Sequence, residues 1–190
     1  GYRDSTVGDI CAEAGISARC FHEHFASKQE VVLTAVEAAL DQVMGYCQEC
    51  FLASGDWPDA VWNTFELCAE WATNEPAFAR VTTVELLTIG PDARELLHSL
   101  MDAFALFLAP GHQLIDSPAP GQLDQTISER VFELLYSHNA HNYPPRLLEL
   151  IPEVARTALT PFLGVRETER FIAERSRRDM VGDATRRGTS

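Results

Sequence analysis

Residues 6–30 read TVGDICAEAGISARCFHEHFASKQE, and this stretch decides the fold of the N-terminal segment. Thr6 and Asp9 have the spacing of a capping box, which predicts the start of a short helix. Gly15 stops that helix, and Ser17 can cap a second short one. Two short helices joined by a glycine-containing turn are typical of a helix-turn-helix, whose second helix is free to enter a major groove.

Small and apolar side chains are expected where the two short helices cross. Ala12, Ala14 and Ile16 are the predicted contact residues at this crossing, and Phe21 and Phe25 are core residues by spacing.

The same stretch resembles the TetR family of bacterial regulators, in which T-x-x-x-I-A-x-x-A-G-V-S leads into L-Y-x-H-F-x-S-K-E-x-L. The matching residues are Thr6–Ser17 and Phe21–Glu30. The resemblance covers roughly the first 33 residues, and the remainder is similar to the family only in being helical. It implies a DNA-binding domain at 1–33, with the family's first helix absent from this chain before Gly1.

The helix-turn-helix and the resemblance together predict which residues meet DNA. Arg19 is placed for bidentate readout of guanine, which is worth ~1–3 kcal/mol of discrimination. Thr6 and Lys28 lie at helix starts, where free N–H groups and the helix dipole favour a phosphate oxygen. The complete predicted set is Thr6, Ser17, Ala18, Arg19, Cys20, His22, Glu23, His24 and Lys28.

Three positions depart from the family pattern. Family members often carry lysine at the place of Ala18, a small residue at the place of Arg19 and tyrosine at the place of His22, so the operator should differ. Residues 1–30 also hold fewer Lys and Arg than Asp and Glu, which weakens the electrostatic argument for DNA binding.

The rest of the chain shows helical spacing and no strand-like alternation, which predicts an all-α fold. We expect a helical ligand-binding and dimerisation domain at 34–180, a surface loop at 110–121 and a mobile tail at 181–190. The predicted helices are a long one from Ser27 to about Ala53, then 57–74, 76–89, 91–109, 122–141, 144–162 and 165–180.

The central helices carry more aromatic residues than simple packing requires, which predicts a cavity for a small apolar or aromatic ligand. An aromatic stripe at helical spacing is more often plain core, so the individual residues are weaker expectations than the cavity. The candidate ligand-binding residues are Trp62, Phe65, Glu66, Trp71, Thr83, His98, Phe104 and Tyr136.

The resemblance implies a homodimer on double-stranded operator DNA, and the apolar faces of 122–141 and 144–162 are the predicted interface. Ligand binding between the central helices is expected to shift the long helix that starts at Ser27. Because the recognition helix rides on its end, operator affinity would fall, as in a repressor. An activator is the alternative that the sequence leaves open.

Composition restricts the remaining function classes. The formal charge of −13 speaks against broad coating of nucleic acid, and no apolar run approaches the ~20 residues of a membrane span. The odd number of cysteines, five, indicates reduced thiols and a cytoplasmic protein. No catalytic motif is present, so neither enzyme activity nor a cofactor is expected.

Two alternatives stay open at this point. One is a family-like ligand-binding module that does not bind DNA. The other, less favoured, is a helical metal protein or enzyme that would use the Cys47-x-x-Cys50 pair or the histidines His112, His138 and His141.

Overall fold

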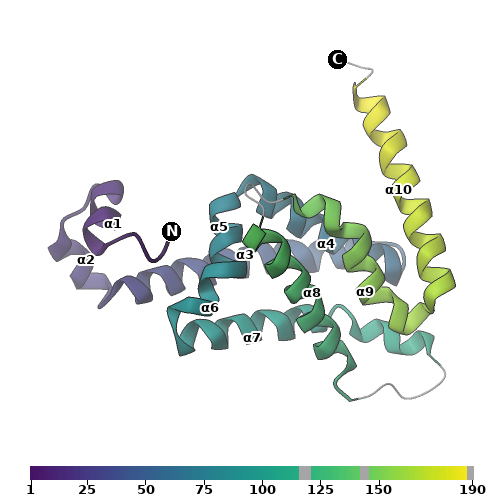
Figure 1. The fold of residues 1–190 in the computed structure, drawn as a ribbon, viewed down its shortest axis with the longest axis horizontal. Coiled ribbons are helices and arrows are strands. Elements are labelled where there is room, and N and C mark those ends of the chain that lie inside the picture. The colour runs from purple at the N-terminus through teal and green to yellow at the C-terminus, as the bar shows by residue number, and fades with distance from the viewer. Residues whose placement is uncertain (116–120, 142–145, 188–190) are drawn as a thin grey trace.

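One long helix organises the molecule. In the computed structural model, which describes residues 1–115, 121–141 and 146–187, α3 (Lys28–Ala53) joins two short N-terminal helices to a bundle (Figure 1). Every regular element in these ranges is helical, so the predicted all-α class is confirmed. The other elements are α1 (Val7–Ala14), α2 (Ala18–His24), α4 (Trp57–Asn74), α5 (Pro76–Arg80), η1 (Val81–Glu85), α6 (Leu86–Ile89), α7 (Pro91–Ala105), η2 (Ala109–Leu114), α8 (Leu123–His141), η3 (Leu147–Leu150), α9 (Ile151–Leu163) and α10 (Val165–Arg187).

Side-chain caps begin several of these helices at the positions that the sequence predicts. The hydroxyl of Ser27 accepts a hydrogen bond from the amide of Glu30 at 3.1 Å, and this contact starts α3. Asp56 caps α4 in the same way, accepting from Asp59 N at 2.9 Å, and Pro58 fits the first turn.

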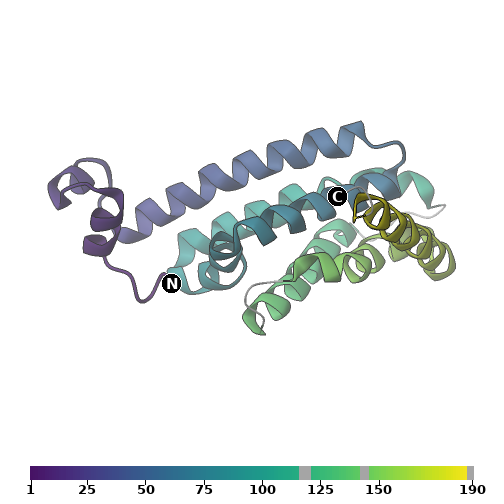
Figure 2. The ribbon, with the colours of Figure 1, turned by 90° about the horizontal axis from the view of Figure 1, so that it is seen from above.

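Two apolar clusters hold the bundle together. The larger one joins α4, α8 and α9 around buried residues such as Trp62, Val131 and Leu159. The smaller one lies between α3, α6 and α7 around Val36 and Leu86 and extends to the start of the chain. Figure 2 shows α3 lying along the bundle, with α1 and α2 at one end and α10 at the other.

The predicted helix at 76–89 contains an interruption. Residues 76–80 are α-helical, η1 (Val81–Glu85) is a π-helical turn, and α6 completes the segment. The amide of Leu86 donates to the carbonyl of Val81, five residues back, which defines the wider turn.

The predicted surface loop at 110–121 is wrong over its first part. Residues 109–114 form a 3₁₀ helix in which Gly111 is buried against the rings of Trp57 and Phe162. A turn-rich composition marks a change of chain direction, but it does not reveal a glycine that lets two aromatic rings approach. Residues 116–120 of this prediction lie outside the described residues.

The other helix boundaries shift modestly. The predicted helix at 91–109 ends at Ala105, and the one at 144–162 begins as the 3₁₀ turn η3 before α9, with 144–145 outside the described residues. The predicted tail at 181–190 is helical as far as Arg187, where α10 ends, and residues 188–190 lie outside the described residues. No helix in the described ranges combines the length and apolar character that crossing a bilayer requires.

Candidate DNA-reading surface and ligand cavity

The N-terminal helices form the predicted tight corner. Gly15 adopts a left-handed conformation with φ of 65°, which lets the amide of Ile16 donate to the carbonyl of Cys11 at 3.0 Å. Cys11 and Phe21 are buried at this corner, and the Phe25 ring packs at a tilt against that of Phe21, with 5.7 Å between ring centroids. Phe21 and Phe25 therefore have the structural role that spacing predicts.

The residues predicted to pack at the helix crossing are placed differently. Ala12, Ala14 and Ile16 are all exposed, and Cys11 and Phe21 supply the contact instead. Over helices this short, one position of rotation decides which side chains face inward, and apolar spacing does not fix that rotation.

Helix α2 presents the predicted reading surface. The side chains of Ala18, His22, Glu23 and His24 are exposed, and Cys20 is half-buried. The side chain of Arg19 is 90 % exposed, and its Nε lies 3.2 Å from Glu23 Oε1 on the next turn. The Ser17 hydroxyl is taken up by its cap, accepting from Cys20 N at 3.1 Å.

The two predicted phosphate contacts are engaged within the protein itself. Asp9 N donates to the Thr6 hydroxyl at 3.2 Å and Thr6 N donates to Asp9 Oδ2 at 2.7 Å, which is the reciprocal pair of a capping box. The Thr6 hydroxyl also donates to Asp9 Oδ2 at 2.7 Å. These bonds, led by the one from the Thr6 side chain, lower the pKa of the Asp9 carboxyl. The helix start therefore already holds an anion of its own.

Lys28 is similarly occupied. Its ammonium donates to the carbonyl oxygens of Tyr2 at 2.6 Å and Ser5 at 2.7 Å, and it lies 4.2 Å from the centroid of the Tyr2 ring. Lys28 thus anchors residues 1–5 on the start of α3 instead of pointing freely toward a phosphate. The carbonyl groups of Tyr2 and Ser5 precede α1 and accept from this ammonium, and a contact between Lys28 and a phosphate stays a prediction.

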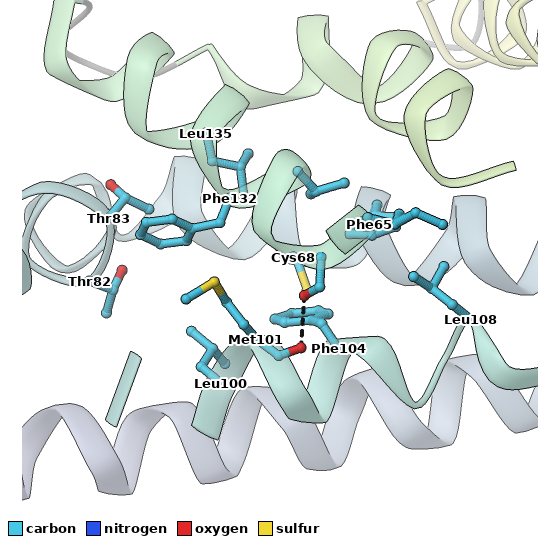
Figure 3. Close-up of a pocket in the computed structure, with 13 residues that line it drawn as sticks. Phe65, Cys68, Thr82, Thr83, Leu100, Met101, Phe104, Leu108, Phe132 and Leu135 are labelled. Carbon is cyan, nitrogen blue, oxygen red and sulfur yellow. Dashed lines mark hydrogen bonds between the residues drawn. The ribbon is translucent and has the colours of Figure 1, made fainter. Parts of the chain in front are cut away.

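A cavity lies within the bundle, as the aromatic load predicts. It has two adjoining lobes of about 90 and 100 Å³, between α4, η1, α7 and α8. Figure 3 shows the residues that line the first lobe. Both lobes are lined by Phe65, Cys68, Thr82, Thr83, Leu100, Phe104 and Leu135. Among the described residues that line them, none carries a charge, so an ionic group has no counter-ion inside.

Hydroxyl groups are the main polar feature of the cavity wall, and each is already hydrogen-bonded. Thr83 donates to the Ala79 carbonyl at 2.6 Å and accepts from Asn139 Nδ2 at 2.8 Å. Thr82 donates to carbonyls of the preceding turn, and Ser128 donates to Met101 O at 2.7 Å. The walls are therefore effectively apolar, which suits a hydrocarbon group.

Half of the predicted ligand-binding residues line the cavity. Phe65, Trp71, Thr83 and Phe104 do so, with Trp71 in one lobe only.

The remaining four point elsewhere. Trp62 packs against Phe171 of α10, and Glu66 pairs with Arg175 at 3.6 Å. His98 and Tyr136 are exposed on the outer faces of α7 and α8. Aromatic or polar character alone does not distinguish the inner from the outer face of a helix.

Sequence reasoning missed most of the aliphatic lining. Leu100 and Met101 precede Phe104 by one helical turn, and Val131 and Leu135 follow Ile127 at successive steps of four residues. This spacing was a usable signal, because residues three or four apart share a helix face.

The cysteines are free thiols that belong to the packing. Cys47 of α3 and Cys68 of α4 place their sulfur atoms 3.1 Å apart, and this contact lowers the pKa of Cys47 and raises that of Cys68 well above its usual range. Burial raises the pKa of Cys50, the other member of the Cys-x-x-Cys pair.

The histidines proposed as metal ligands lie apart from one another. His112 Nε2 contacts Asp124 at 2.8 Å, His138 Nε2 accepts from Arg146 N, and His141 Nδ1 bonds Ser137 O. Nowhere in 1–115, 121–141 and 146–187 do three His, Cys, Asp or Glu side chains gather as a metal site would require.

A helix-turn-helix on the end of a long helix is the arrangement of a DNA-binding transcriptional regulator, and here the attached bundle contains an apolar cavity. Residues 1–35 match the family model described as bacterial regulatory proteins, tetR family. The DNA-binding segment is therefore of the TetR family, as its sequence motif predicts.

Solved structures of regulators share the fold. The chain is similar to the transcriptional regulator FadR from Bacillus subtilis in complex with stearoyl-CoA, with a TM-score of 0.72, 16% identity and coverage of 87% of this chain and 91% of that one. The fatty acid degradation regulator FadR from Bacillus halodurans gives a TM-score of 0.72 and 15% identity over 84% of this chain and 86% of that one. No curated protein sequence matches the chain.

Proposed function

We propose that this protein is a repressor that leaves its operator when an apolar chain-like ligand occupies the bundle cavity. The observation that carries the proposal is the pairing of a TetR-family reading segment with a cavity whose described lining is entirely uncharged. In this proposal residues 1–33 read DNA, residues 34–180 sense the ligand, and no step is catalytic. A regulator of transcription acts where the DNA is, which for a bacterial protein is the cytoplasm.

The ligand class is a fatty acyl group, with any charged head outside the cavity. An alkyl chain gains ~0.8 kcal/mol for each buried CH₂, whereas a buried carboxylate or phosphate would meet no cation there. The structurally similar Bacillus subtilis regulator is in complex with stearoyl-CoA, which supports the same class here.

Operator binding requires two copies of the chain. A homodimer sets two recognition helices about one DNA turn apart, ~34–36 Å, so that both enter successive major grooves. We place the interface on α8 and α9. The apolar stripe of α9, including Val154 and Ala158, packs inside the subunit and is not available to a partner. The faces that α8 and α9 turn to solvent would therefore form the interface.

The experiment is a selection of genomic fragments with the complete protein, followed by gel shifts at two salt concentrations. The proposal expects a defined fragment that binds with a steep salt dependence. The quenching of Trp71 fluorescence by stearoyl-CoA then measures ligand binding without DNA, with Trp71→Phe as the control that identifies the reporting ring.

A ligand-binding module without DNA binding is the second candidate. It is favoured by the acidic surroundings of α1 and α2, where Asp9 occupies a helix start and Glu23 faces Arg19. Quenching of Trp71 with no salt-dependent DNA binding in the selection would decide for this candidate.

A further inference from the structure

We propose that the π turn η1 carries ligand occupancy to the DNA-reading segment through the carboxylate of Glu85, which holds the backbone amide of Tyr2. The inference rests on the proposed ligand response and adds a second route beside a shift of α3. In this scheme Glu85 is a positioning residue that touches neither the ligand nor DNA.

One end of η1 is part of the cavity wall. Thr82 and Thr83 line both lobes, and Thr83 is tied to α8 through Asn139 at 2.8 Å. Figure 3 shows both threonines at one side of the cavity, on the side of Phe132 and Leu100. A molecule that enters the cavity therefore meets this turn.

The other end of η1 holds the start of the chain. Glu85, the last residue of the turn, accepts a hydrogen bond from Tyr2 N at 2.5 Å, and its other oxygen lies 3.5 Å from Arg80 Nε. The Glu85 side chain is only 14% exposed, so water competes little for this bond. Figures 1 and 2 both place the N-terminus beside this part of the bundle.

Tyr2 is in turn fastened to the start of α3. Its carbonyl accepts from Lys28 Nζ, and the same ammonium holds Ser5 O just before the Thr6 cap. Residues Thr83, Glu85, Tyr2 and Lys28 thus form an unbroken series of backbone and hydrogen-bond connections from cavity to reading segment.

The cavity is too small to accept a long chain without movement of its walls. Each lobe is smaller than an engineered cavity of ~150 Å³ that holds benzene, so an acyl chain must displace lining elements. In the proposed scheme the π turn η1 is the element that moves, because π turns are rare within helices and often lie at functional sites. A change in the backbone of η1 would move the Glu85 carboxylate relative to Thr83. The hydrogen bond from Tyr2 N to Glu85 would pass this movement to Tyr2.

Helix α3 has less contact with the cavity than η1 has, so a shift of α3 is a weaker link between ligand and DNA. Helix α3 contributes Leu40, Val43 and Met44 to one lobe only, whereas η1 lines both. Gln29 also contacts Asp92 of α7 at 3.1 Å, so the start of α3 is held from a second side.

The test compares Glu85→Ala with Glu85→Gln, which keeps an acceptor oxygen for Tyr2, and with Glu95→Ala, an exposed control on α7. For each variant, operator affinity is measured with and without saturating stearoyl-CoA, and Trp71 quenching measures binding of stearoyl-CoA itself. A second readout uses protein labelled with ¹⁵N-tyrosine, since the chain has only four tyrosines and the Tyr2 amide is then a resolved NMR signal.

We expect stearoyl-CoA to weaken operator binding about tenfold or more in the unaltered protein and in Glu95→Ala. In Glu85→Ala the weakening should fall below threefold while Trp71 quenching is unchanged, and Glu85→Gln should retain most of it. In the unaltered protein, stearoyl-CoA should shift the Tyr2 signal toward its position in Glu85→Ala.

Full release of operator in Glu85→Ala, or loss of Trp71 quenching in that variant, would overturn the inference. If stearoyl-CoA binds neither the unaltered protein nor any variant, the proposed ligand class is wrong. The role of Glu85 is then tested with Leu135→Phe, in which the larger side chain occupies the cavity instead of a ligand. That variant must move the Tyr2 signal, and an unmoved signal would equally overturn the role of Glu85.

Discussion

Two of the residues predicted to contact DNA make hydrogen bonds within the protein that hold the reading segment in place. The Thr6 hydroxyl, which sequence alone directs toward a phosphate, is committed to Asp9, and Lys28 is committed to carbonyls of Tyr2 and Ser5. Arg19 is the contrasting case, since its guanidinium is almost fully exposed on α2. Specific readout should therefore depend on Arg19, while phosphate contacts by Thr6 and Lys28 stay predictions.

Replacement of Thr6 by alanine should raise the pKa of Asp9 toward its ordinary value of 3.8, because the bond from the Thr6 side chain is the main cause of the lowering. Asp9 stabilises the folded segment above that ordinary pKa, and this contribution disappears as the pH falls through the lower folded value. NMR titration of the Asp9 carboxyl measures the change, and loss of the cap should cost about 1 kcal/mol. Thr6→Ser keeps the hydroxyl, so a rise in that variant too would contradict the assignment.

Arg19→Ala should weaken binding to the selected operator by ~1–3 kcal/mol while leaving binding to random DNA nearly unchanged. Gel shifts at a fixed salt concentration check this, with Arg94→Ala at an exposed position of α7 as the matched loss of one positive charge. An equal loss on operator and random DNA would move Arg19 to the phosphate-contacting residues.

At the scale of elements, helix periodicity and capping residues predict most of the architecture. The predicted helix at 57–74 matches α4, because a proline such as Pro58 fits the first turn of a helix. The π turn at 81–85 was not predictable, since its sequence continues a helical pattern and only tertiary packing selects the wider turn. Cavity residues were predicted where aromatic character and the inner face coincide, as at Phe65 and Phe104, and missed where aliphatic side chains complete the wall.

Helix η2 supplies a test of packing at this scale. A Cβ atom on Gly111 would lie 2.5 Å from the Trp57 ring and 2.9 Å from the Phe162 ring, so Gly111→Ala should destabilise the protein by about 1–3 kcal/mol. Gly45→Ala, in the middle of α3 with open space around it, should instead stabilise by about 0.5–1 kcal/mol. Urea unfolding measures both, and equal effects of the same sign would contradict the packing described for η2.

For the whole molecule, the sensing and reading functions lie in parts that share few direct contacts. The cavity is in the bundle, the reading surface is on α2, and α3 with the segment before α1 connects them. A ligand can shift the operator equilibrium only by its difference in affinity for the two shapes of the dimer. The coupling free energy between ligand binding and operator binding must therefore be the same whether ligand or DNA is added first.

The most direct test of the account is to measure this coupling in both directions on the selected operator. Stearoyl-CoA should weaken operator binding by some factor, and saturating operator DNA should weaken stearoyl-CoA binding, followed by Trp71 quenching, by the same factor. Equal stearoyl-CoA affinity for the free and DNA-bound protein would contradict the claim that this cavity controls the reading surface.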